Sequence, residues 1–256
     1  MVSDSVQGVV AAHYLYEQLG VTRLATLHDG SPYGEGLADV VAERFTMLGG
    51  RVVAQDAISV GDVDYRALLE DIGQERPELI YFAGFAAEGA RLAEQRADAG
   101  IDDVLLMGAD GLRTDEFIYL AGREAEGVFV SAFLPGDSTA LDAFLSRYQV
   151  RYGQPPTGPY HANAYDAMYL LLDAVEAVAQ ISNSGNVQVD RRALIEYVRS
   201  LPRTQGISGI LTADGQGELL TSADIGMARI EGGSFIPLAI GRVRDDQVSI
   251  SPIEPS

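Results

Sequence analysis

Short apolar runs alternate with segments of helical periodicity along the first half of the chain. Five of these runs have the length and composition of buried β-strands, at residues 23–28, 52–58, 79–83, 104–108 and 127–133. Helices are predicted before and between them, from Ser3 as N-cap to a stop at Gly20, and at residues 36–48, 64–72, 86–99 and 114–120. This alternation predicts an α/β fold with a mainly parallel sheet and right-handed crossovers.

The second half of the chain has a different pattern. After Leu134-Pro135-Gly136, three successive helices are predicted with no strand between them, at residues 138–152, 160–180 and 191–201. Short strands follow, with a hairpin turn at Asp214-Gly215, strands at residues 225–230 and 235–240, and a polar, proline-marked tail from Gly241. Helices without a sheet of their own need another surface on which to pack, so we predict a domain boundary near Pro135.

The amino-acid composition limits the classes of protein to which the chain can belong. The 256 residues are 47% hydrophobic, enough for a substantial core in one large or two small α/β domains. The net charge of −19 argues against nucleic acid or an anionic membrane as partner, because both require a basic patch. The absence of cysteine excludes disulfides and thiolate chemistry. Since no membrane-spanning run or signal-peptide pattern is present, we expect either a cytoplasmic protein or a natural start before Met1.

Aromatic and acidic residues follow the predicted strands and form the candidate binding site. In a doubly wound sheet the loops at the carboxyl ends of the strands line the ligand crevice, which places residues 29–33 there. Tyr33 follows the first strand, Phe85 the third and Asp110 the fourth, while Tyr160 begins a long helix. Rings supply apolar walls and a cation-π face, and a carboxylate accepts an ammonium, so this set suits a small cationic or zwitterionic ligand.

Other kinds of chemistry are weaker alternatives. The glycines at residues 34–39 resemble a dinucleotide fingerprint, but Asp39 stands where a glycine is needed, and we expect no cofactor. Asp62 and Asp64 are interpreted as helix caps rather than metal ligands, and no metal site is predicted. His28 beside Asp29 suggests acid-base catalysis in a Rossmann-like enzyme. No nucleophile setting accompanies the pair beyond Ser31, so we predict no catalytic residues and no enzyme.

Several segments resemble one known family through almost the whole chain. The chain is similar to the branched-chain amino-acid (leucine/isoleucine/valine-type) solute-binding proteins of ABC importers, which have the type I periplasmic binding fold. The segments are SDSVQGVVAA (3–12), LHDGSPYGEGLA (27–38), GDVDYRALL (61–69), IYFAGFAAEGARL (80–92), GADGL (108–112), AGREAEGVFV (121–130) and ANAYDAMYLLLDAV (162–175). The resemblance implies two Rossmann-like lobes, each a parallel sheet flanked by helices, that close on an amino acid held between them, with no bond chemistry.

The resemblance also implies a role for each candidate residue. Tyr33 matches a ring after the first strand of the family's second lobe, and Phe85 matches an aromatic of a glycine-rich turn. Asp110 matches the acidic residue that receives the ligand's ammonium, and Tyr160 lies near an aromatic from the other lobe. The predicted ligand-binding residues are therefore Tyr33, Phe85, Asp110 and Tyr160.

The chain departs from the family in that most of a first lobe is not found. The resemblance implies that residues 1–133 are the second lobe, 134–224 are helices and a hairpin of an incomplete first lobe, and 225–256 return to the second. It implies a periplasmic or membrane-anchored extracellular protein that delivers its solute to an ABC permease. Without the sheet of that lobe the helices at residues 138–201 would expose an apolar face, which favours a homodimer or an exchange of segments between two copies. A sensory receptor domain of the same fold is the remaining alternative.

Overall fold

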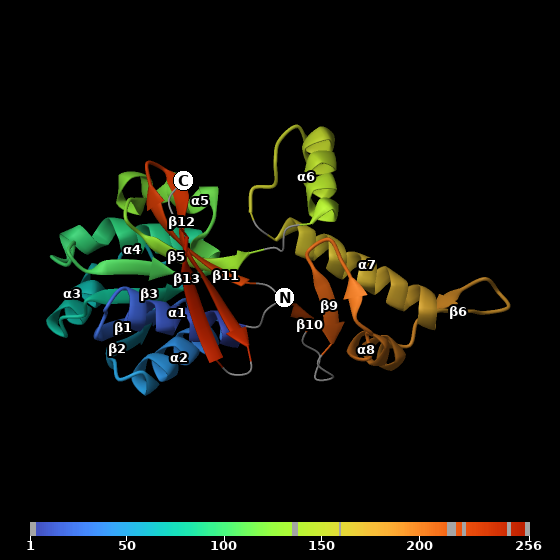
Figure 1. Ribbon diagram of the computed structural model, residues 1–256, viewed down its shortest axis with the longest axis horizontal. Helices are drawn as coiled ribbons and strands as arrows, with labels where there is room; N and C mark the ends of the chain where they lie inside the picture. The colour runs from blue at the N-terminus through green and yellow to red at the C-terminus, as the bar shows by residue number, and fades with distance from the viewer. Residues whose placement is uncertain are drawn as a thin grey trace. The chain divides into compact units, whose positions relative to one another are not determined.

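The computed structural model of the chain describes residues 4–134, 138–158, 160–213, 219–221, 224–244 and 247–253. The chain divides into two compact units, a larger unit of Asp4–Phe133 with Asp224–Ser256, and a smaller unit containing Leu134–Ala223. Figure 1 shows the elements of each unit. The predicted N-cap Ser3 and the predicted turn at Asp214-Gly215 lie outside the described residues.

The larger unit is built on an eight-stranded sheet in the order β13-β12-β11-β5-β4-β3-β1-β2. Its strands are β1 (Arg23–His28), β2 (Arg51–Ala57), β3 (Leu79–Ala83), β4 (Leu105–Gly108), β5 (Phe129–Leu134), β11 (Asp224–Glu231), β12 (Ser234–Arg244) and β13 (Gln247–Pro252). The pairs from β2 to β5 are parallel, whereas β11, β12 and β13 pair antiparallel. The predicted α/β fold with a mainly parallel sheet is confirmed.

Helices cover both faces of this sheet. They are α1 (Asp4–His13), the π-helical turn η1 (Tyr14–Gln18), α2 (Pro32–Met47), α3 (Arg66–Gln74), α4 (Ala86–Asp98), the short turns η2 (Asp110–Leu112) and η3 (Gly122–Ala125), and α5 (Asp115–Ala121). One core joins α3, α4 and α5 to the sheet face that carries Leu27, Phe82 and Val130. Side chains alternate along a strand, so Tyr81 and Ser131 lie on the other face, where α1 and α2 pack (Figure 1).

Helix α2 starts earlier than the sequence pattern predicts, which is at residue 36. The helix begins at Pro32, because Ser31 caps it by accepting a hydrogen bond from the Gly34 N–H to its Oγ at 3.0 Å. Proline suits the first helical position, where its missing N–H is not needed. The earlier start places Tyr33 in the first turn of α2, directly after the end of β1.

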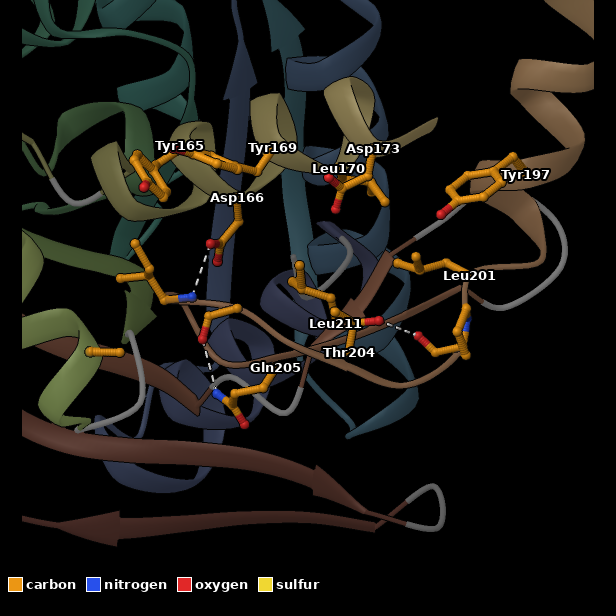
Figure 2. Close-up of a pocket in the computed structure, with 14 residues that line it drawn as sticks. Tyr165, Asp166, Tyr169, Leu170, Asp173, Tyr197, Leu201, Thr204, Gln205 and Leu211 are labelled. Carbon is orange, nitrogen blue, oxygen red and sulfur yellow. Dashed lines mark hydrogen bonds between the residues drawn. The ribbon is translucent and has the colours of Figure 1, made fainter. Parts of the chain in front are cut away.

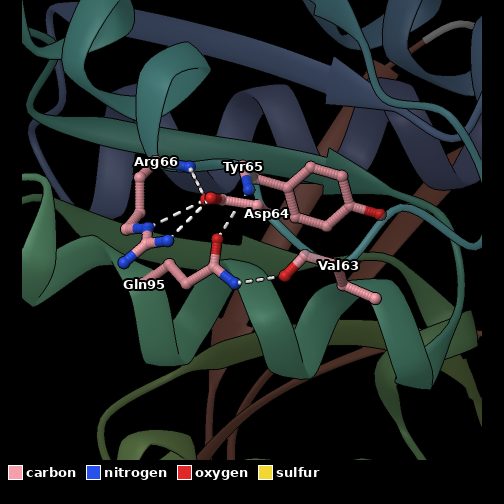
Figure 3. A network of polar contacts seen from close by, with 5 residues as sticks. All are labelled: Val63, Asp64, Tyr65, Arg66 and Gln95. Atoms are coloured by element: carbon pink, nitrogen blue, oxygen red, sulfur yellow. Dashed lines mark hydrogen bonds and ion pairs between the residues drawn. The ribbon is translucent and has the colours of Figure 1, made fainter.

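The loop before α3 is held by hydrogen bonds from side chains of the loop and of α4. Asp64 Oδ1 accepts hydrogen bonds from the backbone N–H of Arg66 at 3.1 Å and from its Nε at 2.8 Å (Figure 3). Gln95 on α4 accepts from the Tyr65 N–H at 2.6 Å and donates to the Val63 carbonyl at 2.9 Å. Asp64 thus satisfies a backbone donor of the first turn as predicted for a cap, although Tyr65 occupies the N-cap position.

The carboxyl-terminal segment is a strand pair, so the prediction of a polar tail from Gly241 is wrong. β12 runs through Gly241 to Arg244, and β13 pairs with it. Val248 and Ile250 alternate with serines, which is the period of a strand with one partly buried face. A Cβ at Gly241 would collide with Val10 on α1, so glycine here allows α1 to pack closely on β12.

The smaller unit combines helices with short antiparallel strands. Its elements are α6 (Thr139–Tyr152), α7 (His161–Val178), β6 (Gln180–Ile181), β7 (Val187–Gln188), α8 (Arg191–Arg199), β8 (Thr204–Gln205), β9 (Ile210–Ala213) and β10 (Leu219–Thr221). The expectation of no strand between the helices is wrong, because β6 and β7 form a hairpin between α7 and α8. Gly185, with φ +78°, provides the left-handed position that its turn requires.

Candidate functional site

Three predicted site residues meet at one edge of the larger unit's sheet. Tyr33 follows β1, Phe85 lies between β3 and α4, and Asp110 begins η2 after β4. The Tyr33 hydroxyl donates a hydrogen bond of 2.6 Å to Asp110 Oδ1. The rings of Tyr33 and Phe85 lie 5.7 Å apart between centroids and are inclined by 33°. Tyr33 therefore contacts both other residues, and Phe85 is 54% exposed.

The Tyr33 hydroxyl is protonated and acts as a hydrogen-bond donor to Asp110. Burial raises the pKa of Tyr33 well above its usual value of 10.0, and the negative charge of Asp110 and the hydrogen bond to it raise it further. The hydroxyl therefore keeps its proton at every physiological pH. It holds one carboxylate oxygen of Asp110 while its ring forms a wall beside Phe85.

A residue that the sequence reasoning missed also contacts Asp110. Gln7 on α1 is fully buried, and its Nε2 donates to Asp110 Oδ1 at 3.1 Å and to Ser131 Oγ at 3.1 Å. The signal in the sequence is a glutamine on the apolar face of the first helix, where an aliphatic residue is the norm. Its partners lie more than a hundred positions away, so no local pattern reveals them.

The loops that carry Phe85 and Asp110 touch each other closely. A Cβ at Gly111 would collide with the carbonyl oxygen of Gly84 and would lie 3.2 Å from the Phe85 ring. Glycine at position 111 is therefore required for the approach of the two loops rather than for a left-handed backbone. The positions of Phe85 and Asp110 are linked through this contact.

His28 and Asp29, the candidate acid-base pair, engage different groups. His28 Nδ1 accepts a hydrogen bond from the Gly30 N–H at 3.1 Å, while Asp29 Oδ1 accepts from Ser31 through its N–H at 3.0 Å and its Oγ at 2.6 Å. Asp29 is buried with 5% exposure. These contacts shape the turn that leads into α2, and Asp29 holds the capping residue Ser31 rather than orienting the imidazole.

The fourth predicted residue, Tyr160, belongs to the smaller unit. It occupies the N-cap position of α7 with φ −97° and ψ 3°, and its side chain does not cap the helix. The structure brings Tyr33, Phe85 and Asp110 together within the larger unit, and Tyr160 is not part of that group. Its role in ligand binding stays a prediction.

Comparison with known proteins identifies the family of the chain. The model of a family described as periplasmic binding protein matches residues 1–234. The chain belongs to this family. Because the match covers most of both units, it agrees with the resemblance found in the sequence segments.

Relatives of this periplasmic binding protein chain include amino-acid-binding proteins. It is 29% identical over 182 residues to the leucine-, isoleucine-, valine-, threonine- and alanine-binding protein of Pseudomonas aeruginosa, covering 69% of this chain and 47% of that protein. It is 28% identical over 221 residues to the Leu/Ile/Val-binding protein of Citrobacter freundii, covering 84% of this chain and 56% of that protein. The chain thus spans about half the length of the curated relatives it matches.

A solved structure supports the fold. The crystal structure of a leucine-binding protein from Thermotoga maritima superposes with a TM-score of 0.78 at 27% identity, covering 93% of this chain and 65% of that chain. The mostly parallel sheet flanked by helices is the type I periplasmic binding protein fold. These relatives are solute-binding proteins rather than enzymes.

A separate pocket of about 410 Å³ lies within the smaller unit (Figure 2). Its lining includes Tyr165, Tyr169 and Leu170 of α7, Tyr197 of α8, and Leu201, which follows α8. Asp166 closes one side by accepting hydrogen bonds from the Ile207 N–H at 2.9 Å and the Ser208 N–H at 2.7 Å. The carboxylate of Asp166 is therefore occupied with backbone donors and serves to fix the segment before β9.

Two further findings concern the described residues only. No group of three His, Cys, Asp or Glu side chains there is placed to hold a metal ion. None of the helices described is long and apolar enough to cross a membrane.

Proposed function

We propose that the larger unit carries the ammonium-binding half of an amino-acid site, and that the chain serves an ABC importer as its extracytoplasmic solute-binding component. The observation that carries this proposal is the Asp110 carboxylate, which accepts a hydrogen bond of 2.6 Å from the Tyr33 hydroxyl. The exposed residue Phe85 lies beside the Tyr33 ring. A carboxylate next to aromatic faces attracts an ammonium by charge and by cation-π interaction. The names of the relatives support an amino acid as the solute.

Each side chain has a proposed task in binding. Asp110 accepts hydrogen bonds from the ligand's ammonium, while Phe85 and the ring of Tyr33 contact its aliphatic side chain. Tyr160, on the smaller unit, is proposed as a further aromatic contact. Pre-orientation of Asp110 by neutral donors favours binding, because little reorganisation is then needed when the ligand arrives.

The two units correspond to different lobes in this proposal. The larger unit is the second lobe of a periplasmic binding protein, and residues 134–224 belong to a first lobe. The resemblance assigns the groups that hold the ligand's carboxylate to other parts of that first lobe. Delivery to an ABC permease and a location outside the cytoplasm, with or without a membrane anchor, rest on the family and its named members.

We also propose that a second copy of the chain packs on α7 of the smaller unit. Met168, Leu171 and Leu172 on this helix are 56%, 46% and 55% exposed. Adjacent exposed aliphatic side chains of this size are unfavourable in water and mark an association surface. A homodimer formed through α7 would remove them from water.

Calorimetric titration tests the proposed site. The purified chain, unfolded and refolded to remove bound solute, is titrated with a panel of amino acids and their amides, beginning with L-leucine. We expect saturable binding that Asp110→Asn weakens by about ten- to a hundredfold, since a hydrogen bond to a charged group is worth roughly 1.5–3 kcal/mol. Asp103→Asn, which removes one exposed carboxylate elsewhere, provides the matched control. Equal affinity of the Asp110→Asn variant and the wild-type chain would contradict the proposal.

A further inference from the structure

The amide of Gln7 connects the proposed ligand carboxylate to the core of the larger unit. Its Nε2 reaches Asp110 Oδ1 at 3.1 Å on one side and Ser131 Oγ at 3.1 Å on the other. The Asp110 carboxylate and the Ser131 hydroxyl oxygen both accept the hydrogens of the Gln7 NH₂ group. Because an ionised carboxylate can only accept hydrogen bonds, the NH₂ end of the amide must face Asp110. Ser131 on β5 is fully buried and gives the amide a rigid anchor.

The other end of the Gln7 amide has an unfavourable surrounding. Its Oε1 is buried and has no hydrogen-bond partner among the described residues. A buried acceptor without a partner destabilises a protein, and an apolar side chain of the same size would avoid that cost. Local rules of this kind are usually broken where a side chain serves a site.

The residue after Gln7 lies at the contact between α1 and α2. Gly8 follows Gln7, and a Cβ at Gly8 would lie 2.7 Å from Cγ1 of Val40 on α2. The absence of a side chain therefore lets α1 and α2 pack closely. With α2 carrying Tyr33 in its first turn, the two donors to Asp110 come from two helices that are packed against each other.

We propose that Gln7 is a positioning residue for Asp110. Together with Tyr33 it holds Oδ1 through two donors from different helices, which restricts rotation of the carboxylate and presents it to the ligand's ammonium in one orientation. Gln7 acts through Asp110 and contacts no ligand itself. This inference rests on the proposed function, because it assigns to Gln7 a part in recognising the ammonium group of the same solute.

The test replaces the amide by an apolar side chain of similar size. Gln7→Met is titrated with L-leucine and, by competition, with 4-methylpentanoate, which is leucine without its amino group. We expect leucine affinity to fall about tenfold, the effect of losing one hydrogen bond to a charged group, and the affinity for 4-methylpentanoate to change by less than about twofold. The melting temperature should be unchanged or higher, because the variant no longer buries an unpaired acceptor. Gln7→Leu provides a second variant of similar volume.

Gln95→Met is the matched control, because Gln95 also bridges two groups in the larger unit but bonds only the loop of Val63 and Tyr65 (Figure 3). It should bind leucine as the wild-type chain does. Three results would overturn this inference without contradicting the proposed function. They are an unchanged leucine affinity in Gln7→Met, an equal loss of affinity for both probes in that variant, and an equal loss of leucine affinity in Gln95→Met. Lack of leucine binding by the wild-type chain, or no effect of Asp110→Asn, would overturn the proposed function and this inference with it.

Discussion

The Tyr33 hydroxyl donates a hydrogen bond of 2.6 Å to Asp110 Oδ1 across 77 positions of sequence. The two residues follow β1 and β4, which are separated in the sheet by β3. The loop after β3 carries Phe85, so its ring lies beside Tyr33. Parallel strands end at the same edge, and this edge is where the larger unit gathers its polar and aromatic side chains.

Tyr33→Phe tests what the hydroxyl contributes to ligand binding separately from the ring. The variant keeps the aromatic wall but leaves Asp110 with one donor fewer, so we expect L-leucine affinity to fall about three- to tenfold by calorimetry. Tyr119→Phe, at a tyrosine that is 85% exposed, should have no effect. If Tyr33→Phe binds as tightly as the wild-type chain, the hydroxyl does not contribute to the site.

Gly111→Ala should disturb two loops at once. The new methyl group would collide with the Gly84 carbonyl and displace Phe85, so we expect a loss of about 1–3 kcal/mol in the free energy of unfolding and weaker leucine binding. Urea unfolding and titration measure the two effects. Gly36→Ala is the control, because its Cβ meets nothing within 4 Å inside α2, and it should raise stability by about 0.5–1 kcal/mol.

Glu78 should make the larger unit sensitive to acid. Its carboxylate accepts hydrogen bonds from the Thr22 N–H at 2.6 Å and the Arg23 N–H at 3.1 Å, which lower the pKa of Glu78 below its usual value of 4.5. A folded-state pKa below the unfolded value adds stability above pH 4.5, and this is lost as the pH falls through the folded-state pKa.

Glu78→Gln should therefore cost about 1 kcal/mol at pH 7, a small value because the site is exposed and solvent weakens its hydrogen bonds. The cost should be smaller at pH 3, because the Glu78 carboxylate becomes protonated as the pH falls. Denaturant unfolding at both pH values provides the measurement. Glu75→Gln, at an exposed neighbour, should lack this pH-dependent difference. An equal cost at pH 7 and pH 3 would show that the charge of Glu78 is not involved.

Leu172→Lys tests the proposed homodimer. Placing a charge at this exposed position of α7 should shift the chain toward monomer, and light scattering after gel filtration measures the mass. Gln149→Lys adds the same charge to an exposed site on α6 and should leave the mass unchanged. A wild-type chain that is monomeric at all concentrations would contradict the dimer.

His28→Ala distinguishes a binding protein from an acid-base enzyme. His28 accepts its hydrogen bond from the Gly30 backbone, so its removal should alter the turn slightly and leave leucine affinity within about twofold. An acid-base enzyme would instead lose turnover by about 10²-fold or more. Loss of a measurable reaction in this variant would favour the enzyme.

The hydrophobic pattern by itself determined the fold of the larger unit, because alternation of buried strands with amphipathic helices leaves few alternatives to a parallel sheet. The predicted strand at residues 23–28 and the strand at 79–83 agree with β1 and β3 residue for residue. Where local signals were weak the predictions were wrong, as for β13, whose alternation of valine and isoleucine with serine is easily taken for a polar tail.

The candidate residues Tyr33, Phe85 and Asp110 could be named from the sequence because strand ends converge, but their contacts could not. Only the tertiary structure places the buried amide of Gln7 against Asp110 and Ser131, 103 and 124 positions away. The reason is physical: a strand or helix is specified by neighbours in sequence, whereas a hydrogen bond between distant side chains depends on how closely whole elements pack. Here that packing depends on Gly8, which lets α1 approach α2, and on Gly241, which lets α1 approach β12.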